Sequence, residues 1–174
     1  YYLFGFVDVD PALRMHIAVG TSLATIIPTS LSSSLAHRRH KSLNSTILRI
    51  WCLPIIVGAI VGVVFAANLS SQVLAGIFAV LAIFFSIYMG LSHENLHLIK
   101  RMPNLLGSVI ISGTVGLMSA MVGIGGGTLS VPIMHLFGAP FRQAVGTAAA
   151  IGFLIAVPGT IGMIWAGNGI SNAS

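Results

Sequence analysis

The sequence predicts an all-α fold: a polytopic transmembrane helical bundle that contains a broken half-helix and forms part of a two-repeat (inverted) fold. Three observations predict it. Only 6% of the 174 residues are charged and 56% are hydrophobic, whereas a soluble domain carries roughly 25% charged residues. The runs 50–93, 102–141 and 143–174 contain no Asp, Glu, Lys or Arg, and each exceeds the ~20 residues that cross a bilayer. A four-residue motif also occurs twice.

The first predicted segment, from Pro11 to about Ala36, is unusually polar for a membrane helix. Pro28 lacks a backbone donor, which predicts a kink near the middle of this segment. A basic loop, 37–41, follows it. The hydroxyl-bearing residues of the segment are Thr21, Ser22, Thr25, Thr29, Ser30, Ser32, Ser33 and Ser34.

Two more segments are predicted at about 48–67 and 73–91, separated by a short polar turn. In the first of them Gly58 and Gly62 lie one turn apart, a spacing that lets a neighbouring helix approach closely. The loop 92–104 then carries two further basic residues. Two crossings separate this loop from the first basic loop, so both share one face, which the positive-inside rule makes cytoplasmic. The predicted location is the bacterial inner membrane, with several passes.

A fourth segment, about 105–122, leads into residues 123–127, Gly-Ile-Gly-Gly-Gly, which we call the glycine string. The apolar stretch after it, 128–137, extends only ~15 Å as a helix, about half the hydrocarbon thickness. A half-helix is therefore predicted here. A last segment follows at about 143–165, and 167–174 is interpreted as a polar loop.

The motif Ala18-Val19-Gly20-Thr21 recurs as Ala144-Val145-Gly146-Thr147. Each copy follows a proline and a basic residue and opens a segment with a proline inside it, which favours duplication over chance. If the half-helix returns to the cytoplasmic face, five segments separate the copies and the second is inverted, as in many secondary transporters. If it returns to the outer face, the repeats are parallel, and the sequence leaves both arrangements open.

The glycine string is the most informative feature for function. Four glycines in five residues weaken a helix by roughly 1 kcal/mol each, and bare backbone at membrane depth is tolerated only where protein buries it or a wet cavity adjoins it. The half-helix that follows begins with free N–H groups and a positive dipole end, which attract anions. Thr128 and Ser130 can add hydroxyl donors. The alternative is that the glycines merely permit tight helix crossing.

These motifs resemble the sulfite exporter TauE/SafE family of membrane permeases. The resemblance rests on Gly116, the glycine string and Pro132, followed by Ala144–Thr147, with Ala18–Ser22 as the counterpart in the first repeat. It implies two repeats, each with its own glycine string. By the same resemblance, the cargo is a small sulfur-containing anion such as sulfite or a sulfonate.

The resemblance also implies that the first glycine string precedes Tyr1 and that further helices follow the last segment. The chain 1–174 is then expected to be a single transmembrane domain, truncated at both ends. Residues 1–122 hold the latter part of the first repeat and the start of the second, and 123–174 hold the broken helix and the helix after it.

The predicted substrate site combines the glycine string with both copies of the repeated motif. Ser22 has no hydroxyl counterpart in the second copy, where Ala148 stands. His135 is a candidate proton site, with a packed, hydrogen-bonded histidine as the alternative. The predicted substrate-binding residues are Gly20, Thr21, Ser22, Gly123, Gly125, Gly126, Gly127, Thr128, Ser130, Gly146 and Thr147.

The expected partners are a small anion and the lipid bilayer. The basic residues cluster at the ends of apolar segments, where membrane topology explains them better than nucleic acid does. The sequence shows no nucleophile–base pair, HExxH motif or acidic cluster, so no enzyme, metal site or cofactor is predicted. A non-transporting scaffold or assembly subunit is the alternative function, and homo-oligomer formation stays open. Trp51 and Trp165 are expected as interface anchors.

Overall fold

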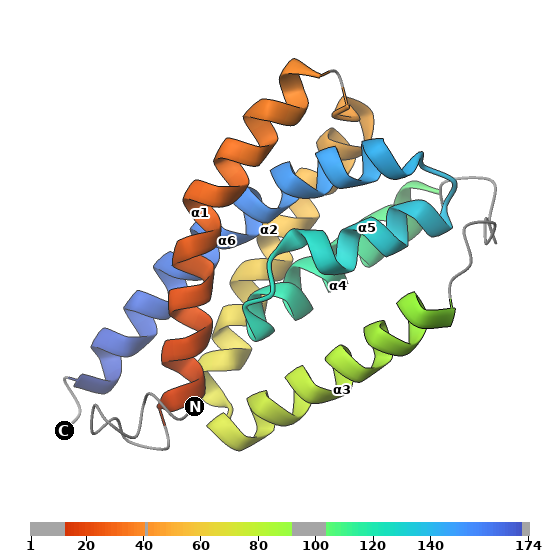
Figure 1. Cartoon of the computed structure of the whole chain (residues 1–174). Helices are drawn as coiled ribbons and strands as arrows, with labels where there is room; N and C mark the ends of the chain where they lie inside the picture. Colours follow the sequence, from red (N-terminus) through yellow and green to blue (C-terminus); the bar gives the residue numbers. More distant parts are fainter. Residues whose placement is uncertain (1–12, 41, 92–103, 172–174) are drawn as a thin grey trace.

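The structure, a computed structural model, describes residues 13–40, 42–91 and 104–171. Every regular element in this described part is an α-helix, as predicted (Figure 1). The helices are α1 (Arg14–Arg39), α2 (Ser45–Asn68), α3 (Ser71–Leu91), α4 (Leu105–Val122), α5 (Gly126–Leu136) and α6 (Phe141–Ser171).

The helices differ in how well they suit a bilayer. Among the described residues, α2, α4 and the Phe141–Gly167 part of α6 are long and apolar enough to cross a membrane. α3 contributes a shorter apolar stretch, Ser71–Ile87. α1 is long enough at 26 residues, but its many hydroxyls lower its hydropathy. The polar character of α1 therefore sets it apart from the other long helices.

Two predicted loops are partly helical. α1 continues through His37, Arg38 and Arg39 of the predicted basic loop 37–41, where basic side chains favour the C-terminal end of a helix, and Lys41 lies outside the described residues. α4 covers 105–122 as predicted, and α1 continues through Pro28 as one helix. The predicted polar loop at 167–174 is wrong, because α6 continues to Ser171. An isolated glycine costs only about 1 kcal/mol in a helix, so Gly167 and Gly169 do not end α6. The basic loop at 92–104 lies outside the described residues except for Asn104.

Glycines bring α2 and α4 into backbone contact, as the spacing in α2 predicts. A Cβ on Gly58 would lie 2.1 Å from the carbonyl oxygen of Gly113, and one on Gly62 would lie 2.4 Å from that of Leu117. Residue numbers increase together along the two helices. α2 and α4 are therefore parallel.

α1 and α6 pack against each other in the opposite sense. Their contacts pair Gly20 with Met163, Leu23 with Gly159, Ser30 with Gly152 and His37 with Gly146. Residue numbers rise along one helix as they fall along the other, so the two helices are antiparallel. The two copies of the repeated motif therefore start at opposite ends of the bundle. An inverted repeat requires this arrangement; the duplication itself stays a prediction.

The chain after α5 returns to the end of the bundle where α2 begins. The backbone amide of Asn44 donates to Oγ1 of Thr147 at 3.0 Å, and its side-chain amide donates to Oε1 of Gln143 at 3.3 Å. Because α4 is parallel to α2, α4 also begins at this end. The chain thus leaves this end of the bundle along α4, turns at the glycine string and returns to the same end along α5. We call this side the basic end, since it carries Arg38, Arg39 and Arg142.

At the opposite end, His16 connects three helices. Its Nε2 donates to the carbonyl oxygen of Ala66 at 2.9 Å, near the end of α2. Its Nδ1 lies 3.4 Å from Oγ of Ser71, the first residue of α3. The start of α1 is thereby fixed to the turn between α2 and α3.

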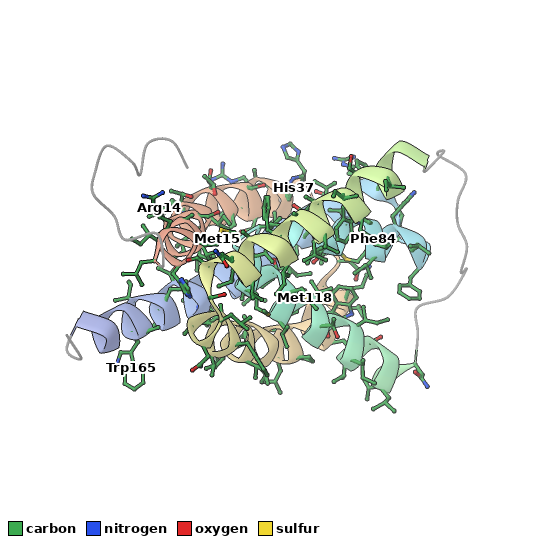
Figure 2. The ribbon with its side chains drawn as sticks, turned by 90° about the horizontal axis from the view of Figure 1, so that it is seen from below. Arg14, Met15, His37, Phe84, Met118 and Trp165 are labelled. Carbon is green, nitrogen blue, oxygen red and sulfur yellow. The ribbon has the colours of Figure 1, made fainter. Side chains whose placement is uncertain are left out.

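The two tryptophans have opposite environments. Trp51 is only 1% exposed, so the expectation that it anchors the bundle at a membrane interface is wrong. It fills the core between helices instead. Trp165 is 82% exposed and projects from α6 (Figure 2), which agrees with an interfacial position.

Candidate functional site: the interrupted helix

The glycine string interrupts the helix between α4 and α5. Gly123, the C-cap residue that follows α4, has φ 71°, and Gly125, the N-cap residue of α5, has φ 78°. Residues that have a Cβ atom rarely adopt these left-handed backbone conformations, so both positions favour glycine. α5 has 11 residues, about 16 Å of helix. The predicted broken helix and half-helix are confirmed.

Neighbouring helices approach the glycine string very closely. A Cβ on Gly126 would lie 2.5 Å from the amide nitrogen of Gly152 in α6, and one on Gly125 would lie 3.0 Å from Cδ1 of Ile26 in α1. Tight crossing is therefore a second role of these glycines, beside the break. The interruption lies where α1, α5 and α6 meet.

Two serine hydroxyls bind the carbonyl groups of the interruption. Oγ of Ser22, from α1, donates to the carbonyl oxygen of Gly123 at 2.6 Å. Oγ of Ser119, from the last turn of α4, donates to the carbonyl oxygen of Gly125. The carbonyl oxygen of Ser119 also accepts the Gly123 amide at 2.9 Å. Both of these glycine carbonyls are thus occupied by donors of the chain itself.

Among the described residues, no side chain caps the first amides of α5. The first N–H groups of a helix find no acceptor inside it, and Gly125, at the N-cap, has no side chain to supply one. Gly127 and Thr128 are exposed, and a Cβ on Gly127 would meet nothing within 4 Å. Open space therefore adjoins the positive end of α5.

Ser130 adds an unpaired hydroxyl one turn from Gly126. Its side chain is fully buried, and its Oγ has no hydrogen-bond partner in the described part of the chain. In the same part of the chain, the hydroxyl of Thr160 in α6 is also buried without a hydrogen-bond partner. Leaving a buried hydroxyl unpaired costs about 1–3 kcal/mol. Ser130 therefore keeps an unused hydrogen-bonding capacity in the described part of the chain, at a buried position one turn from Gly126.

Of the predicted binding residues Gly20, Thr21 and Ser22, only Ser22 forms a hydrogen bond with the interruption. Gly20 faces α6, where its Cβ position lies 3.6 Å from Cβ of Met163. Thr21 is exposed, and its hydroxyl donates to the carbonyl oxygen of Ile17 in its own helix at 2.8 Å. Substrate contact by Gly20 and Thr21 stays a prediction.

The second copy of the motif packs at the basic end. A Cβ on Gly146 would lie 2.6 Å from the carbonyl oxygen of Ser42. Thr147 is fully buried; its Oγ1 accepts the Asn44 amide and donates to the carbonyl oxygen of Gln143 at 2.7 Å. The contacts of both residues are with the end of α1, with the α1–α2 connection and with α6 itself. Their predicted part in substrate binding is not tested by these contacts.

His135 lies in the last turn of α5. Its Nδ1 is 3.3 Å from the carbonyl oxygen of Ala139, and its ring meets that of Phe141 edge to face at 6.1 Å. This is the packed, hydrogen-bonded histidine of the alternative interpretation. A role in proton uptake stays a prediction.

A cavity of about 370 Å³ lies between α3, α4 and α5. Its lining is apolar and includes Phe84 of α3 and Met118 of α4 (Figure 2). The hydroxyl of Thr114, which also lines it, donates to the carbonyl oxygen of Ile110 at 2.9 Å. An anion would lose its hydration here without gaining donors. The interruption is therefore the better candidate for an anion site.

Comparisons with known proteins agree with the membrane fold. A family model described as "Sulfite exporter TauE/SafE" matches residues 2–172. A Haemophilus influenzae protein named "Probable membrane transporter protein" is 32% identical over 97% of this chain and 64% of its own length. Similarly named proteins of Methanocaldococcus jannaschii and Bacillus subtilis are 25% and 28% identical over 95% and 94% of this chain, and 61% and 65% of their own lengths. The chain thus spans less than two thirds of these relatives. No solved structure matches it.

Proposed function

The chain belongs to the sulfite exporter TauE/SafE family of membrane transporters, and on that premise we propose that the protein is a secondary transporter of small anions. The proposed cargo is a sulfur-containing oxyanion, sulfite or a small sulfonate. The proposed location is the bacterial inner membrane. Oxyanions of this kind offer several negatively charged oxygens, which suit a site made of backbone N–H groups and hydroxyls.

The start of α5 is the observation that carries this proposal. Its first amides lack a cap, the space beside Gly127 is open, and the Ser130 hydroxyl is buried and unpaired within the described residues. The two glycine carbonyls that would repel an anion are bound to Ser22 and Ser119 instead. The interruption therefore offers donors with few competing acceptors.

The charge of the surroundings also favours an anion. None of the helices in the described part of the chain contains Asp or Glu, so no carboxylate on these helices opposes a negative ligand. The sequence as a whole carries a formal net charge of +5. A cation transporter would instead be expected to place acidic side chains among its membrane helices.

The arrangement of α1 and α6 supports alternating access as the mechanism. These antiparallel helices cross beside the interruption, where Ile26 and Gly152 contact its glycines. In transporters built from inverted repeats, the substrate binds between the repeats near broken helices, and one repeat rocks against the other. We place the substrate at this crossing.

Uptake of radiolabelled sulfite and methanesulfonate into proteoliposomes that hold the full-length protein tests the proposal. The informative variant is Gly127→Leu, because the side chain has room but fills the space beside the first turn of α5. We expect its initial rate to fall at least about tenfold, equivalent to about 1.4 kcal/mol. Gly76→Leu is the matched control, since a Cβ on Gly76 of α3 also meets nothing within 4 Å. It should transport like the unmodified protein.

Two results would count against transport. If the unmodified protein moves neither anion faster than empty liposomes, the transport proposal is withdrawn and the scaffold alternative takes its place. If Gly127→Leu and Gly76→Leu transport equally well, the binding site lies elsewhere in the protein.

A further inference from the structure

We propose that Ser119 and Ser22 are positioning residues, which hold the peptide groups of the glycine string so that N–H groups, and not carbonyl oxygens, face the anion. This inference rests on the proposed function. Neither hydroxyl needs to touch the substrate, because each acts through the peptide group to which it is bonded.

Ser119 bridges the interruption from the α4 side. It lies in the last turn of α4 and is fully buried. Its backbone carbonyl accepts the Gly123 amide, and its hydroxyl donates to the Gly125 carbonyl. One residue therefore fixes both ends of the turn that joins α4 to α5.

Ser22 holds the interruption from the α1 side. Its hydroxyl donates to the Gly123 carbonyl at 2.6 Å, although 101 positions separate the two residues in the sequence. The neighbouring turns of α1 also contact the string: a Cβ on Gly123 would lie 3.1 Å from Cα of Val19. The glycine string is thus held between α4 and α1 by one hydroxyl from each helix.

Fixing a carbonyl also fixes the amide of the same peptide group. In a trans peptide the C=O and N–H bonds point in opposite directions, and the described chain has no cis peptide bond. The bond from Ser119 to the Gly125 carbonyl therefore orients the Gly126 N–H away from Ser119. The bond from Ser22 to the Gly123 carbonyl does the same for the N–H of Ile124.

Glycine makes this control necessary. Gly123 and Gly125 have φ values of 71° and 78°, and glycine reaches positive and negative φ almost equally well. Without a donor on its carbonyl, a peptide group flanked by glycine can turn over and place its oxygen where the N–H had been. A partially negative oxygen in that position would repel an anion. The serines prevent this reversal.

The transport assay distinguishes positioning from simple support of the fold. We expect Ser119→Ala and Ser22→Ala to raise KM for sulfite about 3- to 10-fold, the loss expected for one hydrogen bond. The maximal rate per folded protein should stay within about twofold of the original value, because the hydroxyls act on ground-state binding. A purely structural role would lower the amount of folded protein and leave KM unchanged.

Two serines of the same helices serve as matched controls. Ser112 is also a fully buried residue of α4, but its hydroxyl donates to the Ser108 carbonyl of its own helix at 2.7 Å. Ser34 is a half-buried residue of α1 whose hydroxyl donates to the Leu31 carbonyl at 3.0 Å. Ser112→Ala and Ser34→Ala should leave KM unchanged. If Ser119→Ala behaves like Ser112→Ala, the positioning role is refuted while the transport proposal stands.

Hydrogen–deuterium exchange of the purified full-length protein tests the same inference without transport. Ser119→Ala and Ser22→Ala should speed exchange in a peptide covering 123–128, whereas Ser112→Ala and Ser34→Ala should not. Should the unmodified protein carry no anion, this measurement still decides whether the serines hold the string. Unchanged exchange in both variants overturns the inference. If one of the two variants fails to fold, the exchange rate of the other variant is enough to decide the test.

Discussion

Gly126 of α5 and Gly152 of α6 lie so close that a Cβ on Gly126 would come within 2.5 Å of the Gly152 amide nitrogen. The backbone of Gly126 fixes the position of such a Cβ, and the Gly152 nitrogen is itself a backbone atom, so no change of side-chain rotamer can relieve this contact. The adjacent Gly127 faces open space instead. Two neighbouring glycines of one motif therefore have different roles: Gly126 allows α5 and α6 to meet, and Gly127 keeps the space beside the first turn of α5 clear.

Alanine at these two positions should separate the two roles. We expect Gly126→Ala to lower the free energy of unfolding by about 1–3 kcal/mol, as for other overpacked cores. Gly127→Ala should be neutral or stabilising by up to about 1 kcal/mol, because alanine favours the helix. Thermal unfolding of the purified full-length protein measures both. Equal melting temperatures for the two variants would show that α5 and α6 do not pack in this way.

Thr147 tests whether the repeated motif binds substrate or supports the fold. Thr147→Val keeps the shape of the side chain but leaves the Asn44 amide without its hydroxyl acceptor. We expect a loss of about 1–3 kcal/mol in unfolding free energy and an unchanged KM for sulfite. Thr21→Val, at an exposed position, is the control for stability. A raised KM with no loss of stability would instead assign Thr147 to the substrate site.

The break in the helix can be predicted from the sequence because both of its signals, the run of glycines and the short length of the next apolar segment, depend only on the local chain. Asn104 caps α4, accepting the Gly107 amide at 3.1 Å, and Gly123 ends it in a left-handed conformation. Both signals lie within the segment itself. The 11 residues of α5 then follow from the spacing between the glycine string and the next turn.

The supporting residues could not be predicted in the same way. Ser119 is one of several serines in an apolar helix, and nothing in its neighbours shows that its hydroxyl reaches the Gly125 carbonyl. The partner of Thr147 lies 103 positions away. Such contacts depend on how the helices cross, which hydrophobic patterning does not specify. The end of α6 was missed because glycine weakens a helix without always ending it.

His16 should stabilise the end of the bundle opposite the basic end. His16→Ala removes the donor to the Ala66 carbonyl and the contact with Ser71, so we expect a loss of about 1–2 kcal/mol in unfolding free energy. His40→Ala, at an exposed position just after α1, should change stability by less than about 0.5 kcal/mol. Chemical denaturation in detergent compares the two. A larger effect at His40 than at His16 would contradict this role.

The threonines of α1 should line a water-filled path beside the interruption. Ser22, Thr25 and Thr29 share one face of α1 by their helical spacing, and Ser22 on that face binds Gly123. Thr25 and Thr29 are exposed and form hydrogen bonds only within α1.

In a Cys52→Ser background, the Thr25→Cys and Thr29→Cys variants should react with an anionic, membrane-impermeant thiol reagent. Val80→Cys and Ile83→Cys, exposed apolar positions on α3, should not, because lipid covers them. Excess methanesulfonate should slow the reaction only at the α1 positions. Equal reactivity at all four positions would place this face of α1 against lipid.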